Sequence, residues 1–184
     1  MSDWIQETLY DNGTLINKLE VRDAQKLAEK EFEITAQRQL FLLKQRIVVK
    51  DISVFAKINE FLFMPLYDWA GKYRHGNFYK GNTTFLDCDR FNYAEEDINH
   101  VLAWQRKENK LVAEDYAQLM DLLNYMHPFR EGNGRSIRLF LQCYAANHGQ
   151  CIIFYPLTND SLIQALINAD ISKIAKLIKV ENAV

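Results

Sequence analysis

Apolar and polar positions alternate most regularly on the two sides of one short polar stretch. Before this stretch, apolar residues recur at i, i+3 and i+4, which is the spacing of an amphipathic helix. Those positions are Tyr116, Leu119, Met120, Leu123 and Met126. After it comes a segment that is apolar nearly all round, which predicts a buried helix. Its apolar positions are Ile137, Leu139, Phe140, Leu141, Tyr144 and Ala145. The pattern predicts two core helices joined by a polar loop.

Helical periodicity also covers the N-terminal part of the chain. After an irregular start with a turn at Asp11-Asn12-Gly13, residues 21 to about 45 have helical composition. Ala24, Leu27, Ala28 and Phe32 fall on one face of this helix, and Leu40, Phe41 and Leu43 follow. Two interpretations are open: the helix packs on the core, or its apolar face docks another chain.

Four further helices are expected. One runs through Phe63, capped by Asp51 and closed by Pro65, and one covers 93 to about 106. Gly149 ends the helix after the polar loop, and a short buried segment at 151–155 stops at Pro156. Two helices follow, one capped by Asn159 or Asp160 and a last one carrying Ile171, Ile174, Leu177 and Ile178. We therefore expect one all-α domain over residues 1–184, with a helical N-terminal extension (1–50), a core (51–155) and C-terminal helices (156–184).

Residues 75–92 differ from their surroundings. Aromatic and β-branched residues are mixed there with turn-forming Gly and Asn, which predicts a short β-hairpin. An isolated two-stranded hairpin is marginal in water, so we expect it to be mobile unless another strand pairs with it.

Composition narrows the class of protein. Apolar residues make up 48% and charged residues 25% of 184 residues, as in an ordinary globular domain. A formal charge of −2 without basic clusters argues against nucleic-acid binding. Cys88, Cys143 and Cys151 are scattered, which favours reduced thiols over a disulfide framework. Without a secretory signal or an apolar run long enough for a membrane span, we expect a cytoplasmic protein, with export by a signal-independent route left open.

The polar loop carries the candidate chemistry. Pro128 ends the first helix near His127, which is the natural general base. Gly132 and Gly134 permit unusual backbone angles and close approach of a ligand to the main chain. The next helix then begins with unpaired N–H groups, which form an anion site.

Charged residues next to this anion site indicate phosphate and a metal ion. Arg135 and Arg138 lie three residues apart and present forked donors that suit phosphate oxygens. Glu131 would repel phosphate on its own and therefore favours a bridging Mg²⁺. Taken singly, each feature has an ordinary structural explanation, such as a turn or a solvated face; together they indicate a phosphate-binding active site. A zinc site and a P-loop are not supported, because their motifs are absent.

The sequence at 127–138 matches, position for position, the signature H-P-F-x-[DE]-G-N-G-R-x-x-R of Fic domains. A second segment, Asp68-Trp69-Ala70-Gly71-Lys72-Tyr73-Arg74, resembles the D-W-A-G-x-x-R element that precedes the active site in Fic proteins. The chain is thus identified as a Fic-like protein, and the resemblance implies a Fic-fold helical domain with a small hairpin flap.

The resemblance also implies a reaction, the transfer of AMP from ATP to a Ser, Thr or Tyr hydroxyl of a target protein. On the matching positions, His127 is the catalytic base and Glu131 holds Mg²⁺. Backbone and amide donors of Gly132, Asn133 and Gly134 hold the phosphates, with Arg135 on the β-phosphate and Arg138 on the γ-phosphate. The flap residues expected to pair with the target backbone are Lys80, Gly81, Asn82 and Thr83.

The sequence also allows a prediction about how the activity is inhibited. Fic proteins are often inhibited by a helix with [ST]-x-x-x-E-[GN], whose Glu pairs with the second arginine. No such motif occurs here: Glu181-Asn182 matches its end, but Leu177 stands where Ser or Thr is required. We expect no self-inhibition of this kind, and either a separate small antitoxin or no such brake. Alternative functions remain: transfer of another phosphate-containing group, removal of AMP, or a non-catalytic nucleotide-binding regulator.

Overall fold

The structure is a computed structural model that describes residues 4–77, 79–80, 83–155 and 159–183, with the backbone alone for Lys80, Asn159 and Asp160. Its α-helices are α1 (Ala24–Leu43), α2 (Ser53–Phe63), α3 (Phe91–Gln105), α4 (Ala113–Met126), α5 (Asn133–Asn147), α6 (Asn159–Ile167) and α7 (Ile171–Ala175). Two 3₁₀ turns, η1 (Gln6–Thr8) and η2 (Cys88–Arg90), complete the helical part. The all-α prediction is confirmed.

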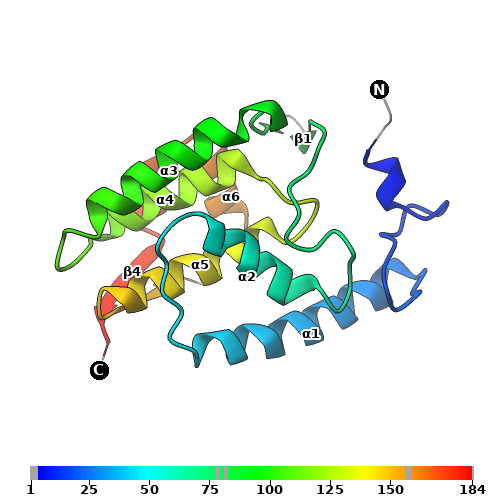
Figure 1. Cartoon of the computed structure of the whole chain (residues 1–184), viewed down its shortest axis with the longest axis horizontal. Coiled ribbons are helices and arrows are strands. Elements are labelled where there is room, and N and C mark those ends of the chain that lie inside the picture. Colours follow the sequence, from blue (N-terminus) through cyan, green and yellow to red (C-terminus); the bar gives the residue numbers. More distant parts are fainter. Residues whose placement is uncertain (1–3, 78, 81–82, 156–158, 184) are drawn as a thin grey trace.

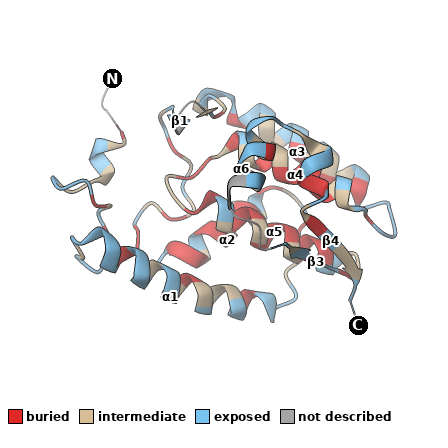
Figure 2. Cartoon of the chain, turned by 180° about the vertical axis from the view of Figure 1, so that it is seen from behind, coloured by how far each residue is buried: buried red, intermediate tan, exposed pale blue. Residues whose placement is uncertain are grey.

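Helix α5 lies at the centre of the fold. It packs against α2 on one side and α4 on the other, with α3 outside α4 and α1 across α2 (Figure 1). Every apolar position predicted for α4 and α5 is buried, because both helices have neighbours on more than one face. Figure 2 shows this buried interior flanked by α1, whose outer side is exposed. The short loop between α4 and α5 is therefore fixed by two core helices.

Helix α1 packs on the core through a different face from the one predicted. Leu27 is buried, as expected, but Phe32 is 74% exposed. The buried stripe continues instead through Thr35 and Leu42, with the acidic side chain of Glu31 between. The prediction of the packed face from apolar residues was wrong, because this helix contacts the core partly through polar groups. Leu40 and Phe41 are also exposed, and nothing in the structure shows what covers them.

Two small antiparallel sheets accompany the helices. The expected hairpin is present as β1 (Tyr79–Lys80) and β2 (Thr83–Thr84), with Tyr79 opposite Thr84; Gly81 and Asn82 lie outside the described residues. A second sheet, β3 (Gln150–Phe154) with β4 (Ile178–Asn182), was not predicted.

The last predicted helix is therefore wrong beyond its first turns. Ile171 and Ile174 belong to the short helix α7, but Ile178 begins strand β4. The pairing of five residues of β4 with β3 outweighs the helical spacing of Leu177 and Ile178. The same pairing makes the predicted segment 151–155 part of an edge strand, which is only half-buried.

Two further predictions concerned the cysteines and membrane spans. Cys88, Cys143 and Cys151 are free thiols. Among the described residues, no helix combines the length and the apolar character that crossing a bilayer requires.

Candidate active site

The loop between α4 and α5 (residues 127–132, the pocket loop) opens onto a pocket of about 720 Å³. The pocket brings together every candidate of the signature: His127, Glu131, Gly132, Asn133, Gly134, Arg135 and Arg138. One wall is apolar and comes from elsewhere in the chain, with Leu162, Ile163 and Leu166 of α6 beside Met120 and Ile137. Tyr79 of the hairpin also faces this space, so hairpin and loop share one pocket.

His127 ends α4 in a left-handed conformation, with φ 42° and ψ 57°. A non-glycine residue in this region is strained, which turns the chain sharply out of the helix before Pro128. The imidazole stacks on Phe85 at 3.8 Å between ring centroids, and its Nδ1 lies 3.2 Å from the carbonyl oxygen of Asn124. A carbonyl can only accept, so Nδ1 carries the hydrogen in this contact and Nε2 is the basic nitrogen of the neutral ring.

The two glycines of the loop have different roles. Gly132 has φ 79°, and a Cβ there would lie 2.1 Å from the ring of Phe63, so backbone angle and close packing both require glycine. Gly134 does not have a positive φ, and a Cβ built on it meets nothing within 4 Å. The prediction of an unusual backbone is thus confirmed for Gly132 and wrong for Gly134, which leaves open space at the start of α5.

Asn133 braces the loop from inside. Its Oδ1 accepts from the N–H of Phe129 at 3.0 Å, and its Nδ2 donates to the carbonyl of Phe129 at 2.8 Å. The side chain is buried, so the expectation that its amide binds phosphate is corrected: the amide is engaged with the backbone. Phe129 is fully buried between Phe55 and Tyr73, as an anchor rather than a ligand.

Asn59 of α2 provides a second brace that the sequence did not reveal. It is fully buried and donates to the carbonyl of Glu131 at 3.3 Å and to Ser136 Oγ at 3.0 Å. Its Oδ1 accepts from the N–H of Gly71 at 2.8 Å. One amide therefore joins the pocket loop, helix α5 and the turn of the second family-like segment.

Arg74, the arginine of that segment, links the pocket loop to the base of the hairpin. It is 4% exposed and donates to the carbonyls of His127 (3.0 Å) and Gly76 (2.7 Å), and also to Leu86. Its own backbone N–H donates to the carbonyl of Pro128 at 2.7 Å. Burial lowers the pKa of Arg74, but the ring of carbonyls suits a guanidinium with five donors.

The N-terminal segment also reaches the site, which no motif indicated. Arg130 donates from Nε to Thr8 Oγ1 at 2.8 Å. The indole N–H of Trp4 donates to the carbonyl of Asn77 at 3.1 Å, and its ring occupies the space beside Gly76. Contacts of this kind could be found only from the folded chain.

The charged groups of the site form a chain of contacts. Glu131 accepts from the N–H of Gly132 at 2.9 Å, its carboxylate lies 3.8 Å from Arg135 Nη2, and its side chain is 42% exposed. Arg135 also pairs with Glu31 of α1, whereas Arg138 lies 5.9 Å from the ring centre of Phe154. The two arginines, both at the pocket, thus have different surroundings.

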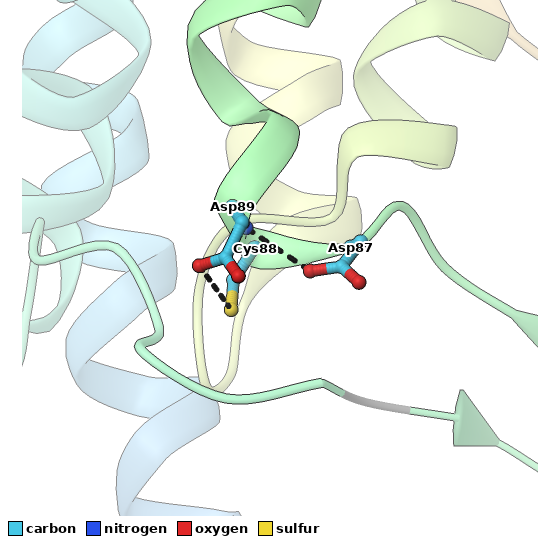
Figure 3. Close-up of side chains that lie close together, drawn as sticks. All are labelled: Asp87, Cys88 and Asp89. Atoms are coloured by element: carbon cyan, nitrogen blue, oxygen red, sulfur yellow. Dashed lines mark hydrogen bonds between the residues drawn. The ribbon is translucent and has the colours of Figure 1, made fainter.

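Glu131 is the one carboxylate that lines this pocket among the described residues. One exposed carboxylate fits Mg²⁺, which is usually held by one or two carboxylates together with phosphate oxygens and water. A second group of potential ligands, Asp87, Cys88 and Asp89, lies at the start of α3 (Figure 3). There, Asp87 accepts from the N–H of Asp89 at 3.1 Å and caps the turn η2, which is an ordinary structural role.

Comparison with known proteins gives a consistent picture. The model of the Fic/DOC family matches residues 51–145. The chain is 28% identical over 156 residues to the probable protein adenylyltransferase Fic of Escherichia coli K12, covering 81% of this chain and 76% of that protein. It is 30% identical over 164 residues to the protein adenylyltransferase VbhT of Bartonella schoenbuchensis, covering 86% of this chain but only 34% of VbhT.

Solved structures resemble this fold closely. The N-terminal Fic domain of a putative cell filamentation protein from Bartonella quintana, with bound ADP, has a TM-score of 0.86 at 23% identity and covers 97% of this chain and 96% of its own. The BepC protein of Bartonella tribocorum, with bound AMPPNP, has a TM-score of 0.83 at 19% identity and covers 96% and 98%. At these identities the likeness establishes the fold.

Proposed function

The chain belongs to the Fic/DOC family, and on that premise we propose that it is a protein adenylyltransferase, which transfers AMP from ATP to a hydroxyl of a target protein. Relatives at 28–30% identity bear this name. The single observation that carries the proposal is the convergence in one pocket of a candidate base, a carboxylate, two arginines and the start of α5.

The reaction is derived from these positions. The hydroxyl oxygen of the target attacks the α-phosphorus of ATP while its proton passes to Nε2 of His127. The bond from the α-phosphorus to the bridging oxygen breaks, and diphosphate leaves. The Nδ1–H contact with the carbonyl of Asn124 holds the ring in the tautomer that this step needs. General base catalysis of this kind typically supplies about 10² to 10⁴ in rate.

The remaining acceleration comes from fixed charge. The backbone N–H groups at the start of α5, together with the positive end of the helix dipole, favour a bound anion. Gly134 leaves room for a phosphate to approach these groups closely. Arg135 and Arg138 hold the β- and γ-phosphates, and Glu131 would hold Mg²⁺, which supplies charge neutralisation on the leaving diphosphate. Asn133 contributes by holding the loop rather than through its amide.

The apolar wall of the pocket supports a nucleotide rather than a bare phosphate. Leu162, Ile163 and Leu166 of α6 line the pocket together with the charged loop. Apolar side chains that line a pocket suit a nucleobase.

The hairpin is proposed as the docking strand for the target. A two-stranded sheet retains unpaired edges, to which an extended peptide can add through main-chain hydrogen bonds. Strand addition aligns a target hydroxyl with His127 and demands little of the side chains. Lys80 and Thr83 lie on these strands.

We further propose that the chain does not restrain itself through the second arginine. No Glu among the described residues pairs with Arg138, and Glu181 lies on strand β4, where it pairs with Lys179 at 2.5 Å. A separate small antitoxin, or no brake of this type, fits this arrangement.

The test is incubation of the protein with Mg²⁺ and α-³²P-ATP in lysate, for the wild type, His127→Ala and the control His100→Ala, whose histidine is exposed on α3. We expect a labelled protein with the wild type and His100→Ala, and none with His127→Ala. Label from γ-³²P-ATP alone would replace the proposal with phosphate transfer. Binding of ATP without any label would replace it with a nucleotide sensor, and release of AMP from a modified protein would replace it with AMP removal.

A further inference from the structure

Glu31 of α1 is an acidic side chain that reaches the active site from outside the family signature. Its side chain is only 12% exposed, and its two carboxylate oxygens contact Arg135 Nη2 and the hydroxyl of Tyr67. Tyr67 is itself 1% exposed, and burial together with Glu31 raises its pKa above the usual value, so it stays protonated and donates. Both oxygens of this carboxylate are therefore satisfied in the interior.

The same helix fixes Arg135 from a second direction. Arg135 Nη1 lies 3.3 Å from Thr35 Oγ1, one turn after Glu31, and the hydroxyl of Thr35 donates to the carbonyl of Glu31 at 2.7 Å. The guanidinium also lies over the ring of Phe63, 4.7 Å from its centre. Two hydrogen bonds and one stacked face leave the planar guanidinium little freedom to rotate.

This fixed guanidinium leads directly to the pocket. Arg135 Nη2 is 3.8 Å from the Glu131 carboxylate, whose Oε1 also accepts from the N–H of Gly132. The ring of Phe63, on which this guanidinium stacks, is also the ring against which Gly132 packs. A displacement of Arg135 would therefore be felt at both the candidate metal ligand and the turn of the pocket loop.

We propose that Glu31 is a positioning residue for nucleotide binding, which acts by holding Arg135 in the orientation that receives phosphate. The inference rests on the proposed function of the pocket. Glu31 contacts Arg135 and not Arg138, the arginine to which the inhibitory glutamate of self-restrained Fic proteins binds. A brake must let go when the nucleotide binds, but release here would leave a buried carboxylate without its cation.

Charge and position can be separated by choice of variant. Glu31→Asp keeps the charge but ends one methylene short of Arg135, so it tests position alone. Glu31→Gln keeps the length and removes the charge. Glu33→Asp is the matched control, because Glu33 is on the same helix, is exposed, and among the described residues has its ion pair with Lys30. Affinity for AMPPNP in the presence of Mg²⁺ is measured by calorimetry on the whole chain, together with thermal unfolding.

We expect Glu31→Asp to raise the dissociation constant of AMPPNP by about tenfold or more, the usual effect of losing a group that orients a ligand-binding residue. Glu33→Asp should leave it unchanged. In an Arg135→Lys background, Glu31→Asp should add much less, because the residue through which Glu31 acts is already altered. A purely structural role would lower the unfolding temperature and leave the two effects additive.

The opposite results would overturn the inference. Unchanged affinity in Glu31→Asp would show that the contact does not position Arg135, and tighter binding in Glu31→Gln would make Glu31 a restraint. If Glu31→Asp fails to fold, Glu31→Gln takes its place, because it removes the charge that holds the guanidinium, and unchanged affinity there would equally overturn the inference. Wild-type protein that binds no AMPPNP would overturn the proposed function as well, whereas normal binding with an inert Glu31 overturns this inference alone.

Discussion

The pocket loop and the hairpin face the same pocket but are held in opposite ways. The loop is braced from within by Asn133, from α2 by Asn59, and by the ring of Phe63 under Gly132. The hairpin consists of two residue pairs, and Tyr79 on its first strand is 72% exposed. Its order therefore depends on what holds its base.

The contrast matches what each region is proposed to do. Phosphate donors must be in place before the transition state forms, because reorganising them during the reaction would raise the barrier. A strand that receives a protein target gains affinity from main-chain bonds and benefits from adaptable side chains. On the proposed function, the element that performs the chemistry and the element that recognises the target line one pocket.

Arg74 is the point at which both regions depend on one side chain, so its loss should have the largest effect. Arg74→Met leaves the partly buried carbonyls of His127, Gly76 and Leu86 without their donor. We expect a loss of about 3–4 kcal/mol in the free energy of unfolding. Urea unfolding measures it, with the exposed Arg106→Met as control, expected within about 0.5 kcal/mol. Equal stability of the two variants would show that Arg74 does not support the pocket loop and the hairpin together.

The two glycines test the rigidity of the loop itself. Gly132→Ala places a methyl group against Phe63 at a positive φ and should cost about 2–3 kcal/mol. Gly134→Ala has room and lies in a helix, so it should raise stability by up to about 1 kcal/mol. The same methyl should nevertheless weaken AMPPNP binding, since Gly134 lines the pocket. Thermal unfolding and calorimetry on both variants check this; similar unfolding temperatures would contradict the difference between the two positions.

The hairpin should show the reverse pattern. Neighbouring residues of a strand point their N–H groups to opposite edges, so replacing both Thr83 and Thr84 by Pro removes one outward donor together with the one that faces β1. Transfer to the target should fall about tenfold, while AMPPNP affinity stays constant and stability changes by less than about 0.5 kcal/mol. A double Val variant keeps the backbone donors and should transfer normally. If the Val variant is equally impaired, side chains rather than the backbone bind the target.

The smallest effect on stability is expected from Asp121 on α4, the helix that precedes the pocket loop. Burial raises the pKa of Asp121. The folded protein then binds this proton more tightly than the unfolded chain, so the contribution of this group to stability falls as pH rises through the interval between the two pKa values. Asp121→Asn should remove that loss, with a gain at neutral pH below about 1 kcal/mol because the group is partly solvated. Unfolding of both proteins across pH 3–8 measures it, and parallel stability curves would exclude the effect.

The sequence was informative where the determinants of structure are local. The periodicity of α4 and α5 and the composition of the pocket loop lie within some thirty residues, and the structure confirms these helices and brings the signature residues together. Helix α1 exists as predicted but presents another face, because its contacts include Glu31 and Thr35, whose partner Arg135 lies about a hundred residues away.

The remaining features depend on pairings that no local pattern encodes. The sequence showed Arg74 only as part of the second family-like segment and Asn59 only as a position in the helix through Phe63, because the bonds that join them to the pocket loop and α5 span 50 to 80 residues. Strand β4 was read as helix because a five-residue alternation is too short to outweigh a helical spacing until its partner β3 is known.

The left-handed backbone of His127 has a consequence for attempts to engineer this protein. Positions 127 and 132 both adopt positive φ, yet only the second carries the residue for which that conformation costs least. On backbone grounds, any selection for heat resistance alone favours glycine or asparagine at 127 and rewards the loss of the imidazole. If His127 is the base, as proposed, a library screened without an activity assay would therefore accumulate stable variants without activity, so the histidine should be held constant from the first round.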